Sequence, residues 1–151
     1  MNSVDQDRDS KQLPVLALAL IGGVLIFCLG SILLHQETGN LLRDRKGEEG
    51  ILLASLAAGT VMLTAAAGLY KSKITDLLSG PGTISEKLAV YRRILVMHLA
   101  LCELVAILSV VGFLLYGNHV FFMMAGLALV EMIRKFPSGS RIKELTDSAN
   151  F

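Results

Sequence analysis

The sequence predicts an all-α fold, an integral membrane four-helix bundle built from two antiparallel transmembrane hairpins. Apolar residues make up 53% of the 151-residue chain and charged residues 18%, whereas an average soluble domain is about a quarter charged. The charges gather in four short stretches. Between them lie apolar runs close to the roughly 20 residues that a helix needs to cross the hydrocarbon core of a bilayer.

The chain divides into two tails and one transmembrane domain. The first run carries no charge, follows an acidic segment and is too long for a signal peptide, so we expect it to be retained as a span. The fourth run is short, and it either tilts, thins the bilayer locally or lies partly in the interface. We predict a cytoplasmic N-terminal tail over 1–12, a transmembrane domain over 13–136 with spans at about 13–34, 51–70, 94–116 and 118–134, and a cytoplasmic C-terminal tail over 137–151.

Several local signals place the ends of these helices. Pro14 is expected in the first turn of the first span, where its missing N–H costs nothing. Thr83 and Glu86 form a capping-box pattern that starts a helix, and Gly80 provides a stop for the preceding helix. Gly117 and Asn118 predict a tight turn before the fourth span. The second and third helices should therefore be the longest and should extend into the cytoplasm through a hairpin tip at 71–93.

Small residues are concentrated in the second span, for example at 57–59 and 65–68. Because small residues let helices approach closely in lipid, we expect this helix to lie in the centre of the bundle. The aromatic residues near the predicted ends of the spans are expected to act as interfacial anchors; they are Tyr70, Tyr91, Tyr116 and Phe136.

The distribution of lysine and arginine predicts the orientation. With four spans, the two tails and the 71–93 loop share one side and carry eleven basic residues, whereas the opposite side carries three. Basic residues favour the cytoplasmic side, so both termini are expected to be cytoplasmic. The formal net charge of +1 provides no basic surface for nucleic acid.

Glu103 is the candidate ion- or proton-binding residue. It lies nine residues into the third span, about 13 Å from the predicted boundary. An acidic residue near the bilayer centre costs roughly 2.5–3.5 kcal/mol and usually faces the bundle or an aqueous cavity. Loss of solvation favours the protonated carboxyl. A structural reading is equally open, in which the protonated group only hydrogen-bonds a neighbouring helix, with Thr60 or Thr64 as possible neighbours.

Three further polar residues fall within the predicted spans. His98 and Cys102 are four residues apart and share a helix face, but the sequence shows no third ligand, so no metal or cofactor is predicted. Glu131 is expected to pair with Arg134 and Lys135 near the cytoplasmic end of the fourth span. The sequence contains no serine–histidine–aspartate set, HExxH or phosphate loop, so an enzyme is not expected.

Two resemblances add to this reading. The stretch Tyr91-Arg92-Arg93, the segment 99–103 and the Gly117-Asn118 turn resemble small uncharacterised bacterial membrane proteins with four helices, which implies a bacterial inner membrane but no particular activity. The second and third spans, with LALCELVAI around Glu103, resemble the c-subunit hairpin of rotary ATP synthases. That resemblance implies that Glu103 corresponds to the proton-carrying carboxylate. The alternating glycines of the c subunit are absent, and the first and fourth spans have no counterpart in it.

Three functions follow as hypotheses. The first is a non-enzymatic helical bundle that supports or anchors a membrane complex, with the lipid bilayer and either a second copy or other subunits as partners. The second is a component that binds or translocates protons or cations through Glu103. The third is a small-molecule exporter, although exporters of this size usually carry the key carboxylate in the first span, and here that span has none.

Overall fold

The computed structural model describes residues 3–39, 48–81 and 83–137, and the described chain is entirely α-helical apart from short connections. The predicted all-α class and the number of helices are therefore confirmed. Most of the predicted C-terminal tail and the polar loop between the first two helices lie outside the described residues. The helices are α1 (Ser3–Thr38), α2 (Glu48–Ser79), α3 (Ile84–Tyr116) and α4 (His119–Arg134).

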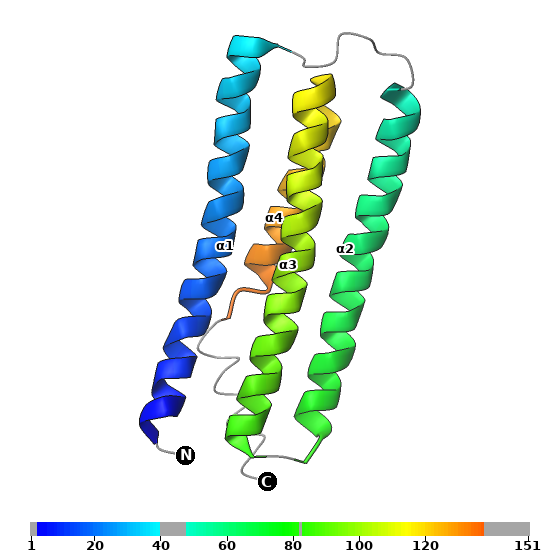
Figure 1. Cartoon of the computed structure of the whole chain (residues 1–151). Coiled ribbons are helices and arrows are strands. Elements are labelled where there is room, and N and C mark those ends of the chain that lie inside the picture. The colour runs from blue at the N-terminus through cyan, green and yellow to red at the C-terminus, as the bar shows by residue number, and fades with distance from the viewer. Residues whose placement is uncertain (1–2, 40–47, 82, 138–151) are drawn as a thin grey trace.

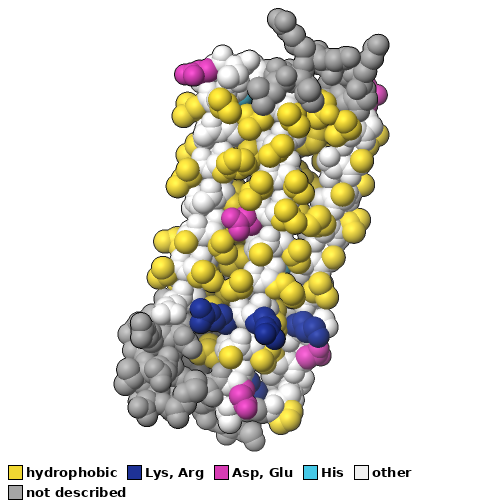
Figure 2. Space-filling model, viewed as in Figure 1, with side chains coloured by type: hydrophobic (Ala, Val, Ile, Leu, Met, Phe, Trp, Pro, Cys, Tyr) yellow, Lys and Arg dark blue, Asp and Glu magenta, His cyan; other side chains and the backbone are white. Residues whose placement is uncertain are grey.

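Three of the four helices are long and apolar enough to cross a membrane: Gln12–Thr38, Glu49–Ser79 and Glu86–Tyr116. α4 has 16 residues and is about 24 Å long at ~1.5 Å per residue, shorter than the roughly 30 Å hydrocarbon core. Hydrophobic side chains cover a broad zone of the face seen in Figure 2, with Lys and Arg side chains in a band at one end of that zone. This distribution is typical of a surface that contacts lipid.

The expectation that the second and third helices are the longest is wrong. α1 has 36 residues, against 32 in α2 and 33 in α3. α1 begins at Ser3, so Pro14 lies inside the helix instead of in its first turn. A proline inside a helix removes the hydrogen bond to the carbonyl four residues earlier, and its ring crowds that carbonyl. That carbonyl belongs to Ser10, which lies before the apolar run, so water can hydrogen-bond to it.

The predicted C-terminal end of α2, the two ends of α3 and the turn into α4 are confirmed. The N–H of Gly80 bonds the carbonyl oxygen of Asp76 at 3.0 Å as α2 ends. Thr83 and Glu86 form the complete capping box at the start of α3. At the other end of α3, Gly117 adopts the left-handed conformation with φ of 68° and its N–H bonds Phe113. Such a conformation favours glycine because it has no Cβ, and it lets the chain reverse into α4 at once.

The arrangement of the helices differs from two simple hairpins. α3 packs against α1, α2 and α4, whereas α1 and α2 barely contact each other. Figure 1 shows α3 between α1 and α2, with α4 behind it. The prediction that the second helix is central is also wrong. Half of the most apolar 18-residue window of α3 is buried, against 28% for α1 and 11% for α2.

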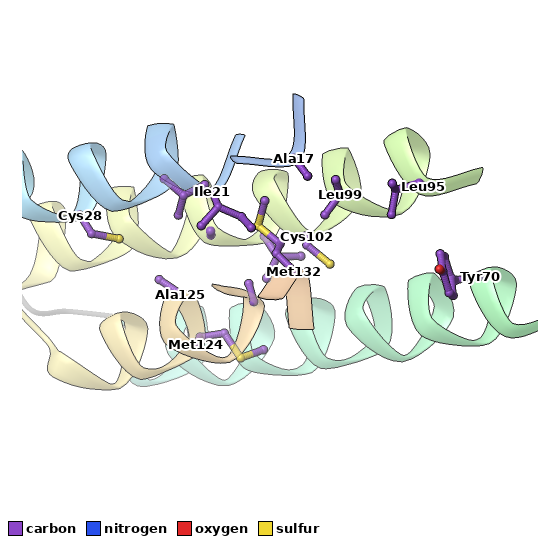
Figure 3. Close-up of a cluster of buried hydrophobic side chains, with 14 of the residues drawn as sticks. Ala17, Ile21, Cys28, Tyr70, Leu95, Leu99, Cys102, Met124, Ala125 and Met132 are labelled. Carbon is purple, nitrogen blue, oxygen red and sulfur yellow. The ribbon is translucent and has the colours of Figure 1, made fainter. Parts of the chain in front are cut away.

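The core forms where α1, α3 and α4 meet. Side chains from these three helices converge in Figure 3, and Tyr70 is the labelled contribution of α2. Leu99, Cys102 and Ala106 of α3 are completely buried, as are Ala125 and Ala128 of α4. Small residues on α4 let it lie close to α3, so α3 is held on several sides and its side chains have fixed surroundings.

Candidate functional site

Glu103 lies at the border between the packed and the exposed sides of α3. Leu99 and Ala106, one turn before and after it, are buried, whereas Ala100 and Ile107 are exposed. Residues three and four apart share a helix face, and Glu103 itself is partly buried. The carboxyl therefore occupies the edge of the bundle, in the middle of the apolar stretch of α3, and is not enclosed in the core.

No partner within the described chain satisfies this carboxyl. Among the described residues Glu103 makes no hydrogen bond or ion pair. His98, which faces α2, lies about 140° away from it around the helix at ~100° per residue. Two cavities of the described structure, of about 790 and 300 Å³, are both lined by other residues. Glu103 is thus an ionisable group on an apolar surface without a neighbour that compensates it.

Thr60 and Thr64, expected as possible neighbours of Glu103, lie on α2 and line the larger cavity. The hydroxyl of Thr64 donates to the carbonyl oxygen of Thr60 at 2.8 Å, within its own helix. No hydrogen bond joins either threonine to Glu103 in the described structure. The structure therefore places these threonines in the groove between α2 and α4, away from the carboxyl.

His98 and Cys102 do come together, as their spacing predicts. His98 is 2% exposed and Cys102 is fully buried. The Nδ1 atom of His98 lies 3.1 Å from the carbonyl oxygen of Ala66 on α2, so Nδ1 carries the donated proton. The Nε2 atom is then free to accept from the Cys102 thiol at 3.7 Å. The pair works as a link between α2 and α3. Within the described residues, no three histidine, cysteine or acidic side chains gather as metal ligands.

Two aromatic and charged contacts extend this link to α4, and sequence reasoning missed both. The ring of Tyr70 lies 5.1 Å from that of His98, and the ammonium group of Lys135 lies 5.1 Å from the centre of the Tyr70 ring. Tyr70 and Tyr91 are 5% and 2% exposed, so neither is an exposed interfacial anchor. Tyr70 and Lys135 each stand at the end of an apolar run and therefore at a similar depth. This shared depth is the signal in the sequence that could have suggested their contact.

Glu131 pairs with both basic residues that follow it, as predicted. Its carboxylate lies 3.1 Å from Arg134 and 3.9 Å from Lys135. The Glu131 side chain is 15% exposed and that of Arg134 is 69% exposed. Arg134 therefore reaches outward while Glu131 stays closer to the bundle. These residues close one end of the larger cavity, where α4 stops.

The larger cavity is a groove of about 790 Å³ between α2 and α4. Its floor is mostly apolar, and basic side chains stand at the end where the apolar runs stop. Apart from the two threonines above, the groove is lined by Leu63, Ala67, Gly68, Tyr70, Lys71, Ile74, Thr75, Leu78, Tyr91, Met124, Leu127, Glu131, Arg134 and Lys135.

No family model, curated protein or solved structure matches this chain.

Proposed function

We propose that this protein is a non-enzymatic membrane bundle that supports or anchors a membrane complex, and that the Glu103 side of α3 docks against a helix of another subunit or a second copy. In this proposal all four helices cross the membrane and both termini are cytoplasmic, because eleven of the fourteen basic residues then lie inside. The resemblance to small bacterial proteins favours a bacterial inner membrane.

The observation that carries the proposal is the uncompensated carboxyl of Glu103 at the edge of the bundle. In hydrocarbon, polar side chains act as contacts between helices, and each hydrogen bond contributes about 0.6–2 kcal/mol. Exposed Ala100 and Ile107 beside Glu103 would let a partner helix approach the carboxyl closely. Glu103 lines neither of the two cavities described above. The geometry therefore favours a contact of Glu103 outside the bundle over an ion path through the bundle.

The test compares assembly of the wild-type chain with that of Glu103→Leu and Glu103→Gln in mild detergent, by native mass spectrometry and by chemical crosslinking in membranes. The wild type should carry a second copy or a stable partner. Glu103→Leu should lose most of it, and Glu103→Gln, which can still hydrogen-bond, should retain more. Ser72→Ala is the matched control, because it removes an exposed polar group from α2 outside the groove lining and should leave assembly unchanged. A wild type that is always monomeric and without a partner would contradict the proposal.

A second candidate function, binding of a proton or cation by Glu103, draws on the same observation, because no basic neighbour among the described residues occupies the carboxyl. Carbodiimide labelling, which attacks protonated carboxyls, separates the two. Docking predicts weak labelling of Glu103 in membranes and strong labelling once harsh detergent dissociates the complex. Ion binding predicts strong labelling in membranes, protection by the bound cation, and ion flux in liposomes that Glu103→Gln abolishes.

A further inference from the structure

The groove between α2 and α4 lies on a different side of α3 from Glu103 and has its own chemistry. Along α2, the lining runs from Thr60 to Leu78, and the part from Thr60 to Lys71 rises about 16 Å at ~1.5 Å per residue. That length matches half of a hydrocarbon core of roughly 30 Å. This part of the groove is therefore as deep as one leaflet. Its charged end lies where α2 and α4 leave the apolar runs, and the lining then continues along α2 to Leu78.

The volume of the groove suits a ligand and not merely a packing gap. At about 790 Å³ it falls within the ~300–1,000 Å³ of typical ligand sites. A Cβ added at Gly68 would meet no atom within 4 Å, so the glycine leaves space on the α2 wall. Leu63, Leu127 and Met124 supply apolar surface on the two walls, as an acyl chain requires.

The charged end of the groove has an excess of positive charge. Lys71, Arg134 and Lys135 stand there, and Glu131 is the one acidic side chain among the described residues of the lining. Glu131 contacts both α4 cations, whereas the described structure shows no ion pair for Lys71. Three cations against one carboxylate leave a site complementary to an anion. Basic pockets between helices on the cytoplasmic side characteristically hold anionic lipid head groups.

We propose that this groove binds an anionic phospholipid of the cytoplasmic leaflet, with the phosphate between Lys71 and Arg134 and an acyl chain along the apolar walls. The contact of Lys135 with the Tyr70 ring holds that cation beside the site. Glu131 keeps Arg134 directed toward the same end through their 3.1 Å contact. The occupant would fill the space between two helices that contact each other only weakly.

Native mass spectrometry of the full chain tests the proposal, with an equimolar mixture of dioleoylphosphatidylglycerol and dioleoylphosphatidylcholine added to the detergent-purified protein. The anionic lipid, dioleoylphosphatidylglycerol, should be retained preferentially. Lys71→Gln should reduce that preference about fivefold, since each basic residue near an anionic surface contributes on the order of 1 kcal/mol. Lys73→Gln is the matched control, because Lys73 is exposed on the same helix and lies outside the groove lining.

A second pair of variants tests the apolar part of the site. Gly68→Leu should fill the groove and reduce retention of both lipids, whereas Gly30→Leu on α1, which also has open space around it, should not. sn-Glycerol 1-phosphate, which lacks acyl chains, should fail to displace the lipid. The proposal is overturned by equal retention of the two lipids, by Lys71→Gln behaving like Lys73→Gln, or by displacement with the soluble phosphate. A partner polypeptide that occupies the groove and resists lipid would overturn it as well.

Discussion

α2 and α3 are nearly equal in length and both are apolar enough to cross a membrane, yet α3 lies in the centre of the bundle and α2 at its edge. α3 has 33 residues and half of its apolar window is buried, whereas α2 has 32 residues and 11% of its window is buried. α3 carries the core contacts to three helices. α2 is attached mainly along one face, where Ala66 and Tyr70 meet His98.

Richness in small residues does not identify the central helix. α2 has more of them, but Ala57, Ala58 and Ala65 are exposed. The burial of α3 comes instead from side chains that fit neighbours on several sides. An exposed face of small residues leaves α2 able to approach something outside the described chain, such as lipid or another subunit.

The largest expected contrast comes from removing a leucine on each helix. Leu99→Ala on α3 should lower the free energy of unfolding by about 2–5 kcal/mol, because it leaves a cavity at a fully buried site. Leu53→Ala on α2, where the side chain is 67% exposed, should change it by less than about 0.5 kcal/mol. Thermal unfolding in mild detergent can be followed with a thiol-reactive dye, since Cys28 and Cys102 are buried. Equal losses for the two variants would contradict the contrast between the helices.

Two glycine substitutions, one on α3 and one on α2, should also differ in their effect on stability, by a smaller amount. A Cβ at Gly112 of α3 would lie 2.6 Å from the ring of Phe121 on α4, so Gly112→Ala should destabilise the fold by about 1–3 kcal/mol through overpacking. Gly68→Ala on α2 has open space and should be neutral or stabilise by up to about 1 kcal/mol, since alanine favours helix. The dye assay measures both, and a Gly112→Ala protein as stable as the wild type would show that α4 is not held tightly on α3.

The smallest effect is expected at the hydrogen bond that joins the two helices. His98→Phe keeps an aromatic ring against Tyr70 but loses the 3.1 Å bond to Ala66, for an expected cost of about 0.6–1.5 kcal/mol. His119→Phe is the control, because His119 is an exposed ring on α4. Crosslinking between cysteines introduced on α2 and α3 should also become less efficient in His98→Phe. Unchanged stability together with unchanged crosslinking would mean that this bond does not fix α2.

Local features of the fold were predictable because local chemistry determines them. The capping box at Thr83 and Glu86, the stop at Gly80 and the left-handed Gly117 each depend on residues within one turn of the chain. The start of α1 was not predicted, because Pro14 looked like a first-turn residue and a helix can continue on its N-terminal side outside the apolar run.

The order of packing was not predictable by the same means. In helices that are apolar nearly all round, lipid-facing and buried sides have similar composition, so hydrophobic periodicity does not show which face is packed. For the same reason the sequence identified Glu103 by its depth but not by its side of the bundle. His98 with Cys102, and Glu131 with its two cations, were found because each set lies on one helix. Tyr70 with Lys135, and the groove itself, require two helices to be placed first.

The central position of α3 has a consequence for how the chain assembles. Synthesis proceeds from the N-terminus, so α1 and α2 are complete before α3 exists, and they barely contact each other. The first two helices are therefore not packed on each other until α3 lies between them, and α4 follows directly through the Gly117 turn. A chain that stopped after Ser79 would hold two helices that barely pack against each other. The second half of the sequence therefore determines how the first half is arranged.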